Sequence, residues 1–491
     1  PKQVLTGLHR RILGNDLVPY IGCDHAKRDG LEQLVFVRAC VETTGALDSQ
    51  SDASLLRFGS AELDTVEAHA PAATIDESTL ISVGHGGMTV LRVAGTPYEM
   101  GRQHGRALAE PIRRVLRRYA DLAGSRWDRI VNFEQATATP ETYFGADELE
   151  ELRGMAAGAG VSEAGLIAHN LRLYLEAGAG GAHVAITSRL NPNTGLLHAV
   201  NEDLRSALGV NDCLARSICV RRPAAALAHL TFAVPGQVGS LNGINIKGLA
   251  VSTAALLDSQ AQPNPLQGTL VTVLVQRILE HATSIEQALE IIQTNPGSVP
   301  FSLCLSDHAS DRLCYVEFDG TTVAMQDSAP SIIAANHRLL GAAAGESPAH
   351  SVYRLNRLRE LLDTDANQSI DIARLQQVLR DRFDANRQLD DDAPTLNTVR
   401  RIDNQMSIVF QPADGAVWVT SGPSANGHQD DFLRFNFDEL FSDAADIQPQ
   451  IQPAPVPETR QAVAEADTAE PTSIDTAPAS AITPAEFAKA Y

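Results

Sequence analysis

Residues 88–124 read MTVLRVAGTPYEMGRQHGRALAEPIRRVLRRYADLAG, and this stretch decides how the main domain begins. Apolar residues alternate with others over 88–94, which predicts a strand. The TPYE segment that follows has the spacing of a capping box, with Thr96 as the N-cap and Glu99 at the third helical position. Pro97 at the first helical position favours the same start. The stretch therefore predicts a strand, a tight turn and a helix.

Two glycines mark one face of this predicted helix. Gly101 and Gly105 lie four residues apart, so both missing Cβ atoms fall on the same side. Each glycine costs about 1 kcal/mol in a helix relative to alanine, which indicates a packing reason for having two of them. We expect another backbone to approach the helix on this face.

The rest of the chain alternates between helical and strand-like patterns. Helices are predicted at 146–159 and 162–176, followed by a glycine-rich break, AGAGGAH, at 177–183. Short strand-like segments then continue to about residue 258, which is typical of antiparallel sheet. Further helices are predicted at 270–294, 352–362 and 370–383, and further strands at 301–305, 313–318, 331–335, 406–411 and 416–420. This order indicates an α+β fold with two antiparallel sheets layered between helices.

The two ends of the chain differ from this core. Residues 1–87 contain two segments with apolar residues at helical spacing, QVLTGLHRRIL and LEQLVFVRACVETTGAL, which predict a helical N-terminal extension. Residues 88–445 are predicted to form the main domain. Residues 446–491 are rich in Pro, Ala and Glu and are predicted to be disordered. The extension and the tail are candidate sites for a protein partner.

Composition excludes several classes of function. The formal net charge of −21 disfavours nucleic acid and anionic membrane surfaces as partners. No apolar run is long enough to span a membrane, and the first residues lack a signal-peptide pattern, so a cytoplasmic location is expected. The six cysteines are scattered without a CxxC pair, and there is no HExxH motif. We therefore expect no metal and no cofactor. The oligomeric state does not follow from the sequence.

Five segments, in order, resemble the isopenicillin-N acyltransferase (acyl-coenzyme A:6-aminopenicillanic acid acyltransferase) family of autoproteolytic N-terminal-nucleophile hydrolases. They are GTPYEMGRQHG, ELRGMAAGAGVSEAGLIAHNLRLYLEA, GLLHAVNEDL, PGQVGSLNGINIKGLAV and AANHRL, spread over residues 90–437. The resemblance implies a four-layer αββα sandwich of two antiparallel sheets between helical layers. It also implies an amidase or acyltransferase that acts on a small-molecule amide or acyl thioester through an acyl-enzyme.

In that family a precursor cuts itself just before a cysteine, whose thiol becomes the nucleophile and whose α-amino group becomes the base. The reference pKa of an α-amino group, about 7.7–8.0, suits a general base at neutral pH. The motif spacing puts the cysteine at Ala182, so cleavage is expected between residues 181 and 182. Three interpretations of the alanine stay open: a replaced natural cysteine, a natural pseudoenzyme serving as a binding or scaffold protein, or a shifted register with another nucleophile. Cys219, Cys304 and Cys314 fit buried core thiols better than nucleophiles.

The resemblance also assigns supporting residues. Asp203 corresponds to the acidic residue that orients the new amino terminus, although a strand-end Asp also caps turns. Asn336 corresponds to the amide that stabilises the oxyanion, with a structural turn amide as the alternative. Glu202 stands where the family usually has an aromatic, and Thr253-Ala254-Ala255 stands where it often has an Asn. Other residues predicted to line the site are His183, Asn201, Asn245 and His337, with Asn245 also fitting a turn.

Overall fold

The structure is a computed structural model. It describes residues 24–28, 31–35, 80–83, 85, 87–120, 133–177, 179–204, 217–257, 268–295, 300–318, 323–340, 346–363, 369–384, 386–387, 389–390, 394–420, 431–443 and 446–454. The chain divides into two compact units, Pro1–Asp64 and Thr65–Tyr491.

The described part of the first unit is a β-hairpin. Strand β1 (Asp24–Arg28) pairs antiparallel with β2 (Leu31–Val35). The prediction of a helix beginning at Leu31 is therefore wrong over β2. The sequence between the strands is Asp29-Gly30, a strong signal for a two-residue hairpin link, which the helical periodicity concealed. The other predicted helical segment, residues 3–13, lies outside the described residues.

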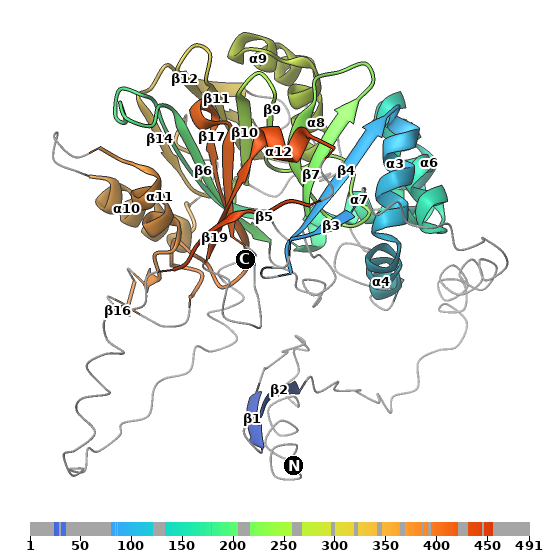
Figure 1. The fold of residues 1–491 in the computed structure, drawn as a ribbon, viewed down its shortest axis with the longest axis horizontal. Helices are drawn as coiled ribbons and strands as arrows, with labels where there is room; N and C mark the ends of the chain where they lie inside the picture. The colour runs from blue at the N-terminus through green and yellow to red at the C-terminus, as the bar shows by residue number, and fades with distance from the viewer. Residues whose placement is uncertain are drawn as a thin grey trace. The chain divides into compact units, whose positions relative to one another are not determined.

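The second unit contains two large sheets (Figure 1). The nine-stranded sheet has the order β13-β12-β11-β10-β9-β8-β7-β4-β3, and among its described pairs only β4 and β7 run parallel. Its strands are β3 (Leu80–Ser82), β4 (Thr89–Gly95), β7 (Ser217–Pro223), β8 (His229–Ala233), β9 (Gly243–Asn245), β10 (Leu249–Ala255), β11 (Phe301–Asp307), β12 (Arg312–Phe318) and β13 (Val323–Asp327).

The seven-stranded sheet has the order β14-β5-β6-β17-β18-β19-β20 and is antiparallel throughout its described pairs. Its strands are β5 (Ala179–Ile186), β6 (Leu197–Leu204), β14 (Ser331–Ala334), β17 (Asn404–Gln411), β18 (Ala416–Thr420), β19 (Phe432–Asn436) and β20 (Gln450–Gln452). A separate two-stranded ribbon joins β15 (Phe383–Asp384) and β16 (Leu389–Asp390).

Helices cover the outer faces of both sheets. The helices are α3 (Pro97–Ala107), α4 (Ala109–Ala120), α5 (Phe133–Ala138), α6 (Ala146–Ala159), α7 (Glu163–Ala177), α8 (Val271–His281), α9 (Ile285–Thr294), α10 (Ala349–Leu362), α11 (Ile372–Leu379) and α12 (Phe437–Phe441). Helices α3 to α9 pack on the nine-stranded sheet, and α10 and α11 pack on the outer face of the seven-stranded sheet.

Between the sheets lies an apolar core that includes Val200, Phe232, Ile244 and Phe410. Residues from both sheets contribute to it, so the two sheets are stacked face to face. The order of layers is helix, sheet, sheet, helix, and the predicted four-layer α+β sandwich is confirmed.

Two predicted segments have a different structure. The helical pattern over 270–294 corresponds to two helices, because the chain breaks after α8 and Ser284 caps α9 by accepting a hydrogen bond from the Gln287 N–H. Within the tail predicted to be disordered, β20 pairs with β19, and Ile451 lies opposite Leu433. Residues 455–491 lie outside the described residues.

The start of the main domain follows its sequence closely. Thr96 caps α3 and accepts from the Glu99 N–H, while the Glu99 carboxylate accepts from the Thr96 N–H. The two glycines of α3 touch α6 directly. A Cβ on Gly101 would lie 2.0 Å from the Glu151 carbonyl oxygen, and a Cβ on Gly105 would lie 2.2 Å from that of Met155. The predicted close approach of a second backbone is confirmed.

The contact between these helices is reciprocal. Gly154 and Gly158 of α6 face α3, where an added Cβ would meet the carbonyl oxygens of Tyr98 at 2.0 Å and Arg102 at 2.3 Å. Four glycines in two helices therefore let the two backbones touch, which fixes α6 and the following α7 over β4 and β7.

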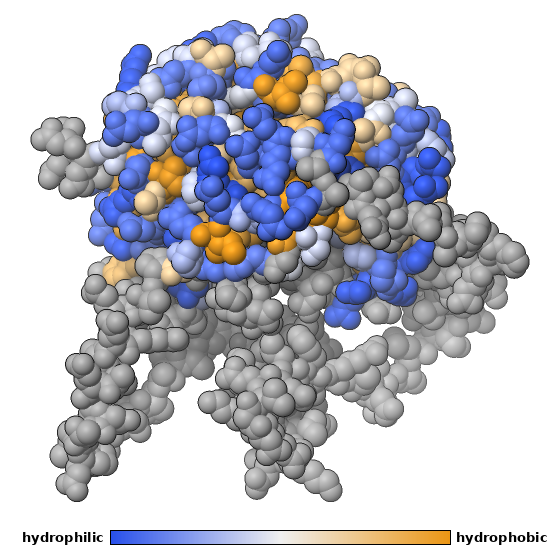
Figure 2. Space-filling model, viewed as in Figure 1, coloured by the Kyte–Doolittle hydropathy of each residue, from blue (hydrophilic) through white to orange (hydrophobic). Residues whose placement is uncertain are grey.

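The molecular surface is mostly polar. Figure 2 shows hydrophobic residues in small groups among hydrophilic ones on the face drawn there. Exposed large hydrophobic residues include Ile402, Ile246, Met325 and Ile451. Scattered residues of this kind are ordinary on a globular protein. In the described part of the chain, no helix is long and apolar enough to cross a bilayer.

Replacement of Gly101 by alanine tests the α3–α6 contact. Alanine normally favours a helix by about 1 kcal/mol over glycine, but here its Cβ overlaps the backbone of α6. We expect Gly101→Ala to lower the free energy of unfolding by about 2 kcal/mol or more in urea titrations. Arg102→Ala, on the exposed side of the same helix, is the matched control and should change it by less than about 0.5 kcal/mol. Equal stability of the two variants would contradict the contact.

Candidate active site

The predicted cleavage position lies inside a strand. Gly180, Gly181 and Ala182 belong to β5, and the glycine-rich sequence is extended and paired with β6 instead of forming the predicted break. Ala182 lies opposite Asn201 in this pairing, and Gly180 lies opposite Asp203. Because directly opposed residues of antiparallel strands share a face, Ala182 and Asp203 point to the same side of the sheet. That side faces α10 and α11, where Ala182 packs in an aliphatic cluster with Leu358.

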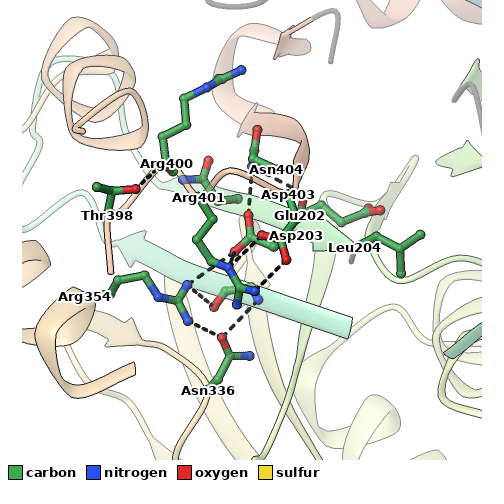
Figure 3. Close-up of polar contacts among 12 residues, drawn as sticks. Glu202, Asp203, Leu204, Asn336, Arg354, Thr398, Arg400, Arg401, Asp403 and Asn404 are labelled. Atoms are coloured by element: carbon green, nitrogen blue, oxygen red, sulfur yellow. Dashed lines mark hydrogen bonds and ion pairs between the residues drawn. The ribbon is translucent and has the colours of Figure 1, made fainter. Parts of the chain in front are cut away.

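Arg354 of α10 connects the groups around this position (Figure 3). Its Nη1 donates to the carbonyl oxygen of Gly181 at 3.3 Å and to the Asp203 carboxylate at 3.3 Å. Its Nη2 donates to the side-chain oxygen of Asn336. Arg354, Asp203 and Asn336 are all fully buried. The guanidinium therefore lies on the carbonyl of the peptide bond that joins residues 181 and 182.

Asn336, just beyond the end of β14, reaches the preceding peptide, which joins Gly180 and Gly181. The Gly181 N–H donates to the Asn336 Oδ1 at 3.4 Å, and the Asn336 Nδ2 donates to the Ala255 carbonyl at 2.9 Å. The structure thus brings Asn336 to Gly181, one peptide before the predicted bond. In this uncleaved chain its amide donor is engaged with Ala255, and Arg354 is the donor that reaches the Gly181 oxygen.

Asp203 is held by two arginines and an amide. Burial raises the pKa of its carboxyl, and the positive charges of Arg401 and Arg354 act in the opposite direction. The Asn404 Nδ2 donates to it at 3.1 Å, and the Arg401 Nε lies 3.7 Å away. Arg401 also makes a two-pronged contact with Asp403, at 2.8 and 2.6 Å. Two guanidinium groups and two carboxylates therefore share one buried cluster.

Of the other predicted site residues, Asn201 and His337 lie near this position, and His183 and Asn245 do not. His183 follows Ala182 and so points to the opposite face, into the space between the sheets. Asn201 donates to the carbonyls of Leu379 and Val399, which ties β6 to α11 and to the loop before β17. Asn245 shapes the β9–β10 turn, because its Oδ1 accepts from Lys247 and Leu249, and its Nδ2 binds the end of α8. His337 contacts Ser351 next to Asn336.

His183 belongs to a buried polar network between the sheets. The Ser252 Oγ lies 2.7 Å from the His183 Nδ1 and 2.7 Å from the His198 Nε2. The outer nitrogens of the two rings contact Ser302 at 3.3 Å and Ser306 at 2.8 Å. Burial lowers the pKa of each histidine to about 3, so both rings are neutral. The network crosses from the seven-stranded to the nine-stranded sheet and helps to fix one against the other.

Glu202 and Thr253, two positions where the sequence departs from the family pattern, are connected by hydrogen bonds through Asn242. The Glu202 carboxylate, between the sheets, accepts from the Asn242 Nδ2 at 2.6 Å. The Asn242 Oδ1 accepts from the Thr253 N–H at 3.3 Å. Glu202 lies opposite Gly181 in the β5–β6 pairing, so this chain has a buried acid where the resemblance leads one to expect an aromatic.

Sequence reasoning missed Arg354 and Arg401. Arg354 carried a readable signal, because Ser351, Arg354, Leu355, Leu358 and Leu362 repeat at helical spacing, and a charge in a buried stripe requires a partner. Arg401 carried none, since it lies in a loop and its burial depends on strands about 200 residues away in the chain.

Comparison with known proteins points to one family. Residues 191–426 match the family model described as Acyl-coenzyme A:6-aminopenicillanic acid acyl-transferase, and this span contains Asp203, Asn336, Arg354 and Arg401. The match covers just under half of the chain. Position 182 lies before the matched span, so the match gives no information on the residue there.

Several solved structures are similar to the chain. The Caenorhabditis elegans ortholog of N-acylethanolamine-hydrolyzing acid amidase has a TM-score of 0.33 and 14% identity, covering 47% of this chain and 93% of its own. A mutant of conjugated bile acid hydrolase from Clostridium perfringens has a TM-score of 0.35 and 12% identity, covering 56% and 97%. Penicillin V acylase from Agrobacterium tumefaciens has a TM-score of 0.29 and 14% identity, covering 54% and 89%. Among curated proteins, none is significantly similar in sequence.

Buried neutral histidines make the fold sensitive to acid. Burial lowers the pKa of His183, His198, His229 and His350 to about 3 and that of His104 and His169 to about 4. Below about pH 6.5 the unfolded chain binds protons at these residues and the folded chain does not, so stability falls as the pH falls. Glu280, whose pKa burial raises to about 7, acts in the opposite sense.

We expect the free energy of unfolding to fall between about pH 7.0 and about pH 5.5 by roughly 1 kcal/mol for each such histidine, less the contribution of Glu280. Urea titrations at both pH values measure this change. His198→Gln should lower the slope of the free energy of unfolding against pH by the contribution of about one proton. His308→Gln, at an exposed position in the turn after β11, is the matched control and should leave the difference in stability between the two pH values close to that of the parent. Equal stability at the two pH values would contradict the neutral histidine network.

Proposed function

We propose that this chain has the site of a self-processing cysteine N-terminal-nucleophile amidase or N-acyltransferase, held as an uncleaved and inactive precursor by Ala182. The observation that carries the proposal is the contact of Arg354 with the Gly181 carbonyl, beside Asp203 and Asn336. The family match supports the reaction class. The proposed substrate is a small acylated amine or amino acid, with water or an amine as the acceptor of the acyl group.

The proposed self-cleavage requires a thiol at position 182. The sulfur attacks the carbonyl carbon of Gly181, and the carbonyl oxygen becomes an oxyanion that the Arg354 guanidinium stabilises. When this intermediate collapses, the bond to the nitrogen of residue 182 breaks and that nitrogen takes up a proton. Water then hydrolyses the thioester, which leaves a carboxylate on Gly181 and restores the thiol.

The same groups suit the reaction of the cleaved protein with its substrate. The freed α-amino group of residue 182 takes the proton of its own thiol, and Asp203, on the same face of the sheet, accepts a hydrogen bond from that amino group. The thiolate then attacks the substrate carbonyl and forms an acyl-enzyme. Once the residues before 182 have moved away, the Asn336 amide and Arg354 are available to the substrate oxyanion.

A second candidate function is that of a natural pseudoenzyme, a binding or scaffold protein on the same fold. Ala182 favours this second function, because its side chain has no nucleophilic group and is fully buried in a hydrophobic cluster. The codon for residue 182 in the source gene separates the two proposals. Cysteine supports the enzyme, and alanine supports the binding protein.

We also propose domain limits and a cellular location. The main domain begins by residue 80, because β3 pairs with β4, and extends to at least 454, beyond the limit of 445 expected from composition, because β20 belongs to its sheet. The described cysteines Cys219, Cys304 and Cys314 are free thiols. Free thiols support the proposal of a cytoplasmic protein.

Replacement of Ala182 by cysteine tests the proposed function directly. The purified 52.5 kDa variant should cut itself into two fragments, whose masses in proportion to their residue numbers are about 19 and 33 kDa. Cleavage is expected because the thiol meets a carbonyl already bound by Arg354. Denaturing gels and mass spectrometry of the larger fragment, with cysteine at its amino terminus, measure the cleavage. The alanine chain is the control and should stay intact. An intact cysteine variant would sink the self-processing proposal.

Arg354→Lys, combined with Ala182→Cys, tests the oxyanion contact. Lysine keeps the charge but cannot reach Gly181, Asp203 and Asn336 together, so we expect self-cleavage to slow about 100-fold. The matched control is Arg357→Lys, since Arg357 lies on the same helix but binds Asp381. Time courses of fragment formation compare the two. Equal rates for both lysine variants would remove Arg354 from the mechanism.

A further inference from the structure

The first turns of α10 hold Asn336 at two points. The Asn336 main-chain N–H donates to the Ser351 Oγ at 2.7 Å. One turn further along the helix, Arg354 donates to the Asn336 side-chain oxygen. Asn336 lies beyond the last residue of β14, and its N–H bonds to this hydroxyl rather than to a neighbouring strand. One helix therefore fixes both the main chain and the side chain of the residue.

The Ser351 hydroxyl is itself oriented. Its oxygen lies 2.7 Å from the His337 Nδ1. Because the Asn336 N–H points at a lone pair of this oxygen, the hydroxyl proton is available to the imidazole nitrogen. Ser351 is fully buried and His337 is only 8% exposed, so little water competes for these bonds. The hydroxyl thus accepts from the Asn336 N–H and is held at a second point by the His337 ring.

These contacts determine where the Asn336 amide lies. Its Oδ1 accepts from the Gly181 N–H at 3.4 Å, and its own carbonyl accepts from the Leu257 N–H at 3.0 Å. A shift of the main chain at Asn336 moves the amide relative to the bond between residues 181 and 182. Displacements of about 1 Å at a reacting centre cost up to about 100-fold in rate.

We propose that Ser351 is a positioning residue, which acts through Asn336 to place its amide at the Gly181 peptide. Ser351 does not itself touch the peptide bond that reacts. The consequence for chemistry rests on the proposed self-cleavage, whereas the positioning of Asn336 is a property of the uncleaved alanine chain.

The kinetic test uses the Ala182→Cys chain as the parent. Adding Ser351→Ala should slow fragment formation between about 10- and 100-fold. Ser351→Thr keeps the hydroxyl and should retain most of the rate. Leu362→Ala, at the far end of α10 in its aliphatic cluster, is the matched control for destabilisation of the helix and should leave the rate near that of the parent.

A double-variant cycle separates positioning from general loss of structure. If Ser351 acts through Asn336, then Ser351→Ala should cause no further slowing once Asn336→Ala is present. Full additivity of the two effects, or a Ser351→Ala rate equal to that of the parent, would overturn the proposal.

Hydrogen exchange gives a readout without cleavage. In the alanine chain, Ser351→Ala should speed amide exchange at least about 10-fold in peptides containing Asn336, and Leu362→Ala should not. Unchanged exchange would overturn the positioning role. Faster exchange, together with a cysteine variant that stays intact, would support the positioning and reject the proposed function, so the two failures are distinguishable.

Discussion

The burial of Arg354 and Asp203 is the constraint on which the site depends. Removing two such ions from water costs several kcal/mol for each, and a mutual contact offsets that cost only when further hydrogen bonds satisfy both groups. Here the guanidinium has the Gly181 carbonyl and the Asn336 amide, and the carboxylate has Asn404 and Arg401. Helix α10, strands β5, β6 and β17 and the loops on either side of them must all be in place for this cluster to exist.

This constraint explains the glycines before Ala182. A Cβ on Gly180 would lie 2.7 Å from an Arg401 nitrogen and 2.9 Å from the Asp203 Cβ, and a Cβ on Gly181 would lie 3.1 Å from that of Ala254. Larger residues would push the strand away from the charges that bind its carbonyl. Gly180 therefore fits the packing of an extended strand against the ion cluster, and Gly181 fits the packing of the same strand against β10, whether or not the chain is cut there.

How far the sequence predicts this structure depends on the range of the contacts involved. The capping box of α3 follows from residues three positions apart, and Asp203 and Asn336 were found by motif and lie at the Gly181 peptide. The prediction that His183 lines the site rests on its place next to residue 182 in the sequence. In a strand over 179–186, neighbouring residues point to opposite faces, so His183 lies on the face between the sheets. Arg401 was beyond reach, because the reason for its burial lies in strands far away in the sequence.

The charge balance of the cluster bears on what cleavage would do. In the uncleaved chain, Arg354 and Arg401 are matched by Asp203 and Asp403, and the peptide at Ala182 adds no charge. A protonated α-amino group at residue 182 would add a positive charge to a buried cluster that is already neutral. Burial of this unmatched charge would favour the neutral amine, which is the form that can take a proton from a thiol. Alanine at 182 leaves this arrangement intact, so under the proposed mechanism the charges around the base would be in place while its nitrogen stays bound in a peptide.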